Sequence, residues 1–307
     1  MFRTKEDFIL TGRRHDAVDE EFPLTDSEFA DDTAALFTSR RSVEKDVPLL
    51  YNHFARFGME VHKGNVPTEK KSKTEILFCA KPLHMYNNPE TYDDANLSNV
   101  ELGNGDYIPI VAFFVYLGCV LSRDCSDTLD VRNRIEKAGG AFGSLRDDVF
   151  KSTRISYEAK SFVYSFLVLS ILLYGAETWS LTEALLHELR CFHAKCVRAM
   201  CRVTRKHTYE HSVSTDDLLE RLNLKHVDTY ITTRQLRWAG HVSRMDFNRL
   251  PRKMLSCWVN EKRPRGAPSM TYGRSLRKAL ARVGVPPDSW HQEAAERESW
   301  RDIINDL

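Results

Sequence analysis

The pattern of apolar residues changes near Asp127, and this change limits the chain to a fold with two kinds of structure. Before this point, short β-prone runs alternate with polar and glycine-containing breaks. After it, apolar residues recur at spacings of three and four. Alternating runs form strands, whereas the longer spacing marks one face of a helix. The sequence therefore predicts an α+β fold, in which a small antiparallel sheet precedes a mainly helical region.

The individual elements follow from the same patterns. Hairpins are predicted over residues 24–37 and 107–122, with Gly118 supplying backbone freedom at the second turn. Residues 76–79 are expected to form a strand, residues 81–104 a loop, and residues 261–273 a flexible linker. Helices are predicted over residues 43–57, 130–141, 157–174, 182–203, 217–222, 228–237, 275–283 and 291–304.

The first of these helices is expected to begin at Ser42 as its N-cap and to stop at Gly58. Four apolar residues at helical spacing predict its buried stripe, namely Val47, Leu50, Phe54 and Phe57.

Two adjacent carboxylates, Asp31 and Asp32, lie at the bend of the first predicted hairpin. Their repulsion is relieved when a cation is bound. Mg²⁺ suits this position, because it takes carboxylate oxygens and keeps sites open for water and phosphate. Two-metal phosphoryl transfer uses carboxylates in this way. Because Asp is also common in turns, a solvated acidic turn is the alternative.

A series of motifs in order carries a family resemblance. Phe29-Ala30-Asp31-Asp32 resembles the palm-hairpin signature of reverse transcriptases, an aromatic residue followed by Ala-Asp-Asp. Phe57-Gly58-Met59-Glu60 and Lys73-Thr74-Glu75 look like the family's next palm motif, and Val115-Tyr116-Leu117-Gly118 resembles its primer-grip turn. Residues 172–179, 236–245, 263–268 and 296–301 resemble the thumb and post-thumb of non-LTR retrotransposon polyproteins.

The resemblance extends from about Gly12 to the C-terminus and implies a domain plan. Residues 1–122 would be a partial palm with a primer-grip-like hairpin, residues 123–260 a helical thumb and connection, and residues 261–307 a linker with C-terminal helices. The implied activity is RNA-directed DNA polymerisation on an RNA template with a DNA primer. Asp31 and Asp32 would hold Mg²⁺, Lys73 would lie near the incoming nucleotide, and the primer end would lie near Tyr116, Leu117 and Gly118.

Only 28 residues precede Phe29. The family places its fingers and most of its palm, including a further metal-binding Asp, before this hairpin. We therefore expect the chain alone to be a catalytically incomplete fragment of the polymerase, able to associate with the missing portion. The alternatives are a non-catalytic nucleic-acid-binding remnant and a helical scaffold protein.

The net charge of +1 conceals an asymmetry along the chain. Residues 1–130 carry 14 Lys and Arg against 23 Asp and Glu, whereas residues 131–307 carry 30 against 20. Within the basic part, one side of the helix over residues 182–203 is apolar. Another side of it carries basic residues at the same spacing, which continue past its end. We call these four residues the basic row: Lys195, Arg198, Arg202 and Arg205. Such a row predicts phosphate contacts; the alternative is an ordinary solvated helix face.

A second constellation resembles a metal site only superficially. Cys196, Cys201, His207 and His211 have a spacing that zinc sites use. Five residues along a helix turn the two cysteines about 140° apart, however. Cys196 also belongs to the apolar side of the helix, so a core cysteine with surface histidines is the favoured interpretation. Trp238 and Trp300 are likewise expected to be core residues rather than base-stacking ones.

The remaining features concern the compartment. The N-terminus runs directly into charged residues and shows no secretory signal. The longest apolar run, residues 162–174, is too short to span a bilayer and predicts a buried helix. Seven cysteines, an odd number, are typical of reduced thiols, and we expect an intracellular protein without membrane contact.

Overall fold

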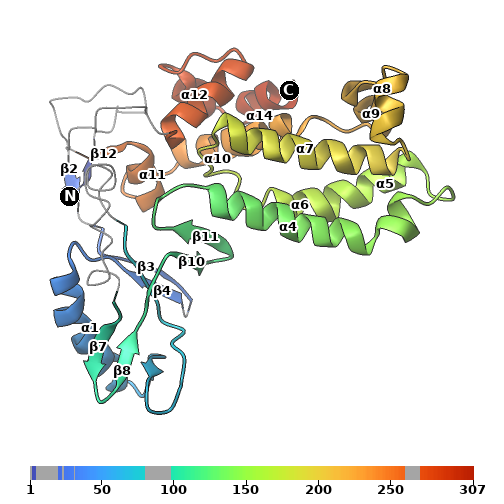
Figure 1. Cartoon of the computed structure of the whole chain (residues 1–307). Helices are drawn as coiled ribbons and strands as arrows, with labels where there is room; N and C mark the ends of the chain where they lie inside the picture. The colour runs from blue at the N-terminus through green and yellow to red at the C-terminus, as the bar shows by residue number, and fades with distance from the viewer. Residues whose placement is uncertain (1, 5–19, 23, 31, 80–97, 260–269) are drawn as a thin grey trace. The chain divides into compact units, whose positions relative to one another are not determined.

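A computed structural model describes residues 2–4, 20–22, 24–30, 32–79, 98–259 and 270–307, and it confirms the α+β class (Figure 1). The chain divides into two compact units. We call Glu21–Ser126 the N-terminal unit, and Asp127–Trp258 together with Ala267–Leu307 the helical unit. Three short strands lie where the chain divides: β1 (Phe2–Thr4), β2 (Glu20–Phe22) and β12 (Cys257–Val259).

The N-terminal unit is built from small sheets around one helix. Two antiparallel hairpins, β3–β4 and β10–β11, stand as separate two-stranded sheets, which confirms both predicted hairpins. A three-stranded sheet has the order β5-β8-β7, and β6 pairs with β9 in parallel. The strands are β3 (Asp26–Phe29), β4 (Asp32–Ala35), β5 (Gly64–Asn65), β6 (Ile76–Leu77), β7 (Val100–Gly103), β8 (Asp106–Ile108), β9 (Ile110–Val111), β10 (Phe113–Tyr116) and β11 (Cys119–Ser122). Strand β7 lies inside the segment predicted as a loop over residues 81–104. The loop prediction was therefore wrong for the last residues of that segment.

Helix α1 (Arg40–Ala55) begins earlier than the sequence predicted. The Ser39 side chain accepts a hydrogen bond from the Ser42 N–H at 3.1 Å, so Ser39 is the N-cap and Ser42 lies in the first turn. Two serines three residues apart offer the same capping chemistry, and the local pattern does not distinguish them. Gly58, with φ of 72°, follows the helix end as expected.

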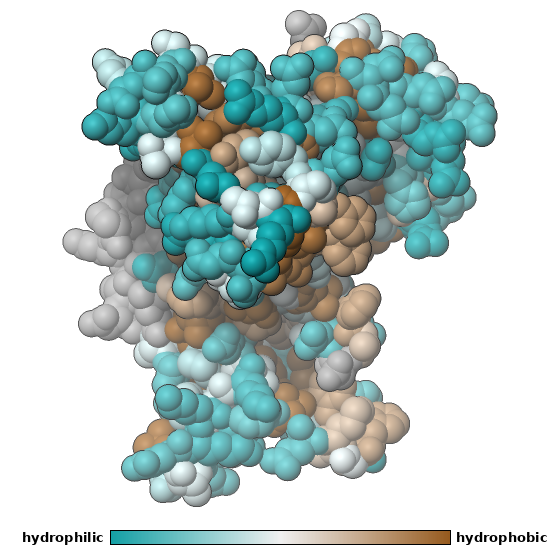
Figure 2. Space-filling view, turned by 90° about the vertical axis from the view of Figure 1, so that its right-hand side faces the viewer, coloured by the Kyte–Doolittle hydropathy of each residue, from teal (hydrophilic) through white to brown (hydrophobic). Residues whose placement is uncertain are grey.

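The buried face of α1 also differs from the prediction. Val43 and Val47 are buried, whereas Leu50 and Phe57 are 38% and 68% exposed. The helix packs on β7, and the buried apolar residues of this unit, among those described, form one small cluster: Val43, Val47, Val100 and Ile108. Many large apolar side chains stay at the surface, and Figure 2 shows brown apolar areas between teal hydrophilic ones on the face it presents.

All other helices of the described residues lie in the helical unit. Its elements are α4 (Thr128–Ser144), the π-helix η2 (Arg146–Phe150), α5 (Tyr157–Val163), the π-helix η3 (Tyr164–Leu169), α6 (Ser170–Leu172), α7 (Glu183–Met200), α8 (Arg205–Glu210), α9 (Thr215–Leu222), α10 (Val227–Ser243), α11 (Leu250–Leu255), α12 (Tyr272–Arg282), α13 (Trp290–Ala295) and α14 (Arg297–Asn305). Each helix predicted after Asp127 is found, although the run over residues 157–174 is interrupted by η3 and the last predicted helix is split into α13 and α14.

The main core of this unit lies between α4, the α5–α6 run, α7 and α9. Phe142 and Phe150 stack at 4.3 Å between ring centroids, and Tyr164 meets both rings edge-on. His193 is buried beside them, with Nδ1 2.8 Å from the Tyr164 hydroxyl and Nε2 3.1 Å from the Lys225 carbonyl. Burial lowers the pKa of His193 to about 4, so the ring is neutral in the folded unit at neutral pH.

A second core joins α10 to the C-terminal helices α12, α13 and α14. Trp300 is buried, as expected, and its indole N–H donates to the Leu236 carbonyl at 3.0 Å. Gly240 makes this approach possible, because a Cβ at that position would lie 2.2 Å from Trp300 Nε1. Trp238 is partly buried and meets Tyr272 edge-on at 5.5 Å.

An ion network ties three helices of this unit together. Asp228 on α10 accepts hydrogen bonds from Arg190 on α7 and from Arg282 on α12, at 2.5 Å and 2.9 Å. Burial alone would raise the pKa of the Asp228 carboxyl, but the two guanidinium groups outweigh it and hold that pKa at about 2.

One prediction for this unit was wrong. The apolar run over residues 162–174 is not wholly buried, because Phe162 and Phe166 are 70% and 75% exposed. None of the described helices is both long and apolar enough to cross a membrane.

Candidate functional site

The acidic hairpin of the N-terminal unit is formed as the sequence predicted. Strands β3 and β4 pair in antiparallel register, with Phe29 opposite Asp32 and Asp26 opposite Ala35. Ala30 has φ of 54°, a left-handed conformation that costs a non-glycine residue energy and closes the turn tightly. Asp32 is exposed as the first residue of β4, and Asp31 lies outside the described residues.

The second hairpin carries the predicted primer-grip residues. Tyr116 ends β10, Cys119 begins β11, and Leu117 and Gly118 form the turn with φ of 48° and 82°. Two successive positive φ values give a type I′ turn, whose twist suits a two-residue hairpin. Tyr116 is half-buried, whereas Leu117 and Gly118 are exposed.

A contact between residues far apart in the sequence joins the two hairpins. The Tyr116 hydroxyl donates to the Ser27 carbonyl of β3 at 3.4 Å. The structure thus brings Tyr116 onto the hairpin that bears Asp32. Lys73 is exposed before β6, where its backbone N–H donates to His62 Nδ1 at 3.0 Å. Within the described residues, its side chain makes no hydrogen bond to either hairpin.

The donor chemistry at the acidic hairpin fits one loosely held Mg²⁺ ion. Asp32 presents an exposed carboxylate, and Mg²⁺ needs only one or two carboxylates when water and phosphate complete its shell. Among the described residues, no group of three or more His, Cys, Asp or Glu side chains comes together as a metal cage. Asp32 is thus the described carboxylate at this turn that could hold a cation.

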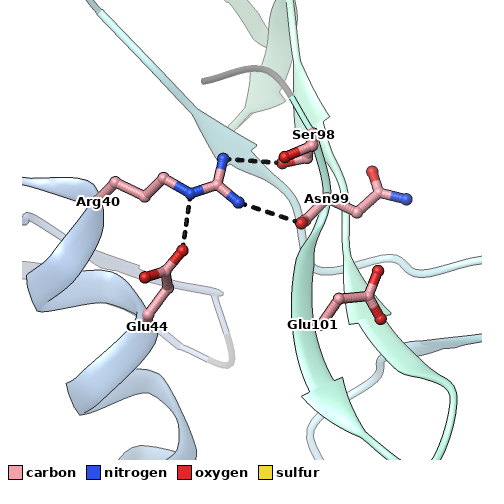
Figure 3. Close-up of a pocket in the computed structure, with 5 residues that line it drawn as sticks. All are labelled: Arg40, Glu44, Ser98, Asn99 and Glu101. Atoms are coloured by element: carbon pink, nitrogen blue, oxygen red, sulfur yellow. Dashed lines mark hydrogen bonds and ion pairs between the residues drawn. The ribbon is translucent and has the colours of Figure 1, made fainter. Parts of the chain in front are cut away.

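An open pocket of about 620 Å³ lies elsewhere in the N-terminal unit, between α1 and the residues leading into β7 (Figure 3). Arg40 spans it, donating to Glu44 Oε1 at 2.7 Å and to the carbonyls of Ser98 and Asn99 at 3.1 Å and 3.3 Å. Glu101 completes its lining. Because Arg40 is used to fasten α1 to the sheet, we interpret this pocket as structural. None of the predicted site residues lines it.

The basic row of the helical unit is assembled from two helices and a turn. Lys195 and Arg198 lie on α7, Arg202 takes φ of 58° in the turn after it, and Arg205 begins α8. The single helix predicted over residues 182–203 is therefore broken within the row. Lys195, Arg202 and Arg205 are exposed and Arg198 is half-buried.

The described residues supply no acidic partner to these four cations within ion-pair distance. Lys206, next to the row, pairs instead with Glu210 at 3.5 Å. Cations that no carboxylate neutralises are the arrangement that phosphate binding needs.

Of the four residues with zinc-like spacing, the structure buries Cys196 and exposes both histidines, as predicted, but it also buries Cys201, which lies at the C-cap of α7. Cys196 and Cys201 are buried, and burial raises the pKa of the Cys196 thiol to about 12. His207 and His211 lie on and just after α8, with ring centroids 4.2 Å apart. A thiolate is the form that binds metal, so burial disfavours Cys196 as a ligand. None of the seven cysteines, all of them in described residues, forms a disulfide.

Sequence reasoning missed an exposed aromatic pair. Phe162 on α5 and Phe166 on η3 have rings that are nearly parallel, with 7° between planes and 6.1 Å between centroids. Their spacing of four residues was visible in the sequence, but it lay within an apolar run and was assigned to the core. The polar residues at the same spacing, Glu158 and Ser170, were the available signal for an exposed face.

The chain is 24% identical over 288 residues to an uncharacterised transposon-derived protein of Caenorhabditis elegans, covering 92% of this chain and 95% of that protein. This similarity supports a transposon origin for the chain. No family model matches the chain, and no solved structure does so significantly.

Proposed function

We propose that the chain is a fragment of the reverse transcriptase of a non-LTR retrotransposon, comprising the end of the palm, the thumb and the post-thumb region. In this role it binds the RNA template and DNA primer through the basic row. The observation that carries the proposal is the contact between the two hairpins, because Tyr116 of the primer-grip-like hairpin donates to Ser27 on the first strand of the acidic hairpin, 89 residues away. The transposon-derived relative and the ordered motifs support the same origin.

The chemistry proposed for this site follows from its residues. Asp31, as the direct ligand, and Asp32 beside it would hold Mg²⁺, which lowers the barrier for attack of a primer 3′-hydroxyl on a nucleotide phosphate. Tyr116, Leu117 and Gly118 would position the primer end, and Lys73 would approach the triphosphate. Two carboxylates of one turn cannot fix two ions relative to primer and nucleotide. We therefore expect the chain alone to bind nucleic acid without extending a primer.

The binding half of the proposal is tested by salt dependence. Replacement of Arg198, Arg202 and Arg205 by Ala removes three phosphate contacts, so the slope of log affinity against log salt should fall by about 2 for a single strand. A matched control removes three exposed cations of the N-terminal unit, Arg41, Lys45 and Lys71, and should leave the slope near its original value. An unchanged slope in the first variant would show that the basic row is a solvated face.

The catalytic half is tested by primer extension on an RNA template with Mg²⁺ or Mn²⁺. The chain alone should incorporate no nucleotide above background. Template-dependent incorporation that Asp31→Ala or Asp32→Ala abolishes would instead make this a working minimal polymerase. A scaffold protein of another class would bind nucleic acid in none of these assays.

A further inference from the structure

We propose that Phe162 and Phe166 form a base-stacking platform, on which unpaired bases of a single strand rest while its phosphates lie along the basic row. This inference rests on the proposed nucleic-acid binding and adds a separate subsite to it. The two rings are 70% and 75% exposed, although they belong to the same run as the buried Tyr164 and Leu172. Exposed phenylalanines at the edge of a well-packed core lose hydrophobic free energy unless something covers them.

The composition of the run over residues 157–174 favours bases over a protein helix as the occupant. The large apolar side chains exposed on described residues 157–174 are all aromatic: Tyr157, Phe162, Phe166 and Tyr174. Grooves that receive a helix depend on several aliphatic anchors, whereas stacking platforms for single strands use aromatic faces. The platform lies partly on the π-helix η3, and π segments occur often at functional sites.

Cations contact the two tyrosines at the ends of the 157–174 run. Lys160 Nζ lies 5.5 Å from the Tyr157 ring centroid, and Arg134 Cζ lies 4.3 Å from that of Tyr174. Both cationic residues are buried, while the tyrosines remain 43% and 48% exposed. A cation against one face of an aromatic ring restrains it by cation–π attraction and leaves the rest of the ring to solvent.

Charge for the phosphates comes from the neighbouring basic row. Lys160 of α5 donates to the Met200 carbonyl at the end of α7, and Ser161 donates to the Leu222 carbonyl of α9. These contacts place the start of α5 beside the end of α7, where Arg202 follows, and Figure 1 shows α5 at the same end of the helical unit as α8 and α9. The end of the basic row therefore lies near the start of the run that carries the two phenylalanines, and single-strand binding combines positive charge with aromatic faces.

The test measures fluorescence anisotropy with two labelled probes about 20 nucleotides long, an oligothymidylate and an abasic strand with the same phosphates. Combined Phe162→Ala and Phe166→Ala should weaken binding of the first probe by about 5- to 150-fold, the range expected for loss of one stacked base, and leave abasic binding unchanged. Combined Phe162→Leu and Phe166→Leu keeps apolar bulk but removes the aromatic faces, and should weaken binding in the same selective way. Phe57→Ala, which removes a 68% exposed phenylalanine of the N-terminal unit, is the matched control and should bind both probes normally.

The outcomes separate this inference from the proposed function. If the wild-type chain binds both probes and the alanine pair binds both equally well, the platform is overturned while phosphate binding stands. Normal binding of both probes by the leucine pair would also overturn the platform. A change only in self-association, measured by sedimentation, would overturn it as well and point to a second copy as the occupant. A wild-type chain that binds neither probe overturns both proposals. Circular dichroism confirms folding, since neither ring is needed in the core.

Discussion

The buried imidazole of His193 gives the clearest prediction, because it makes the stability of the helical unit depend on pH. His193 is 2% exposed, and burial lowers its pKa from an ordinary value near 6.5 to about 4. Below about pH 6.5 the unfolded chain takes up a proton that the folded unit refuses until about pH 4. The free energy of unfolding therefore falls as pH drops through this window, and it rises again as pH increases.

The magnitude follows from the same values. Each pKa unit corresponds to about 1.4 kcal/mol, so a shift of roughly 2.5 units predicts a loss of about 3 kcal/mol between pH 7 and pH 4. That loss is a large fraction of a typical domain's stability. Replacement by Gln keeps an amide that can reach the Tyr164 hydroxyl or the Lys225 carbonyl but cannot titrate. His193→Gln should lower the free energy of unfolding at pH 7. Between pH 7 and pH 4, however, the variant should lose about 3 kcal/mol less of that free energy than the wild type.

Urea unfolding followed by circular dichroism at half-unit pH steps measures the effect, because the difference between the two curves removes carboxylate titrations common to both. His241→Gln replaces an exposed histidine of α10 and should follow the wild-type curve. Parallel curves for wild type and His193→Gln between pH 7 and pH 4 would refute the reasoning, since they would mean that the buried ring is protonated as readily in the folded as in the unfolded state.

Two further substitutions test the packing of the helical unit. Asp228→Asn should cost about 2 kcal/mol at pH 7, because it leaves Arg190 and Arg282 without their shared carboxylate. The cost should vanish as pH falls from about 4 towards 2, where the carboxyl takes up its proton, and urea midpoints at both ends of that window would check it. Gly240→Ala should lower the free energy of unfolding by about 1–3 kcal/mol, although alanine has the better helix propensity, because the new Cβ displaces Trp300 from the Leu236 carbonyl. A blue-shifted or unchanged tryptophan emission, together with unchanged stability, would contradict this.

Local chemistry explains which elements the sequence predicted. Helices α4, α7, α9 and α10 carry long apolar stripes whose spacing fits only a helix. The β10–β11 hairpin turns where Gly118 allows a positive φ, and the acidic hairpin turns between two short β-prone runs. Short elements such as β7 and α11 have too few residues to show a period. The π-helix η3 leaves the apolar pattern of the 157–174 run in place, so the sequence reads as one continuous helix.

The candidate sites were only partly predictable, because they depend on contacts between distant residues. The sequence places Asp32 in a turn and Tyr116 before another turn, but nothing local indicates that Tyr116 donates to Ser27. The row of cations was visible, yet its break at Arg202 depends on a single left-handed residue. Phe162 and Phe166 were assigned to the core because apolar content alone does not say which side of a helix faces solvent.

The two units support their candidate sites with very different amounts of packing. In the described residues of the N-terminal unit, the apolar cluster has only four buried side chains with partly buried ones around them, and both candidate hairpins are separate two-stranded sheets. Isolated hairpins are marginally stable in water, so the positions of Asp32 and Tyr116 depend on weak local contacts. The basic row and the aromatic pair instead lie on helices that enclose an extended core. Packing therefore fixes the proposed binding surfaces of the helical unit without a ligand, whereas the acidic hairpin needs further contacts to become equally rigid.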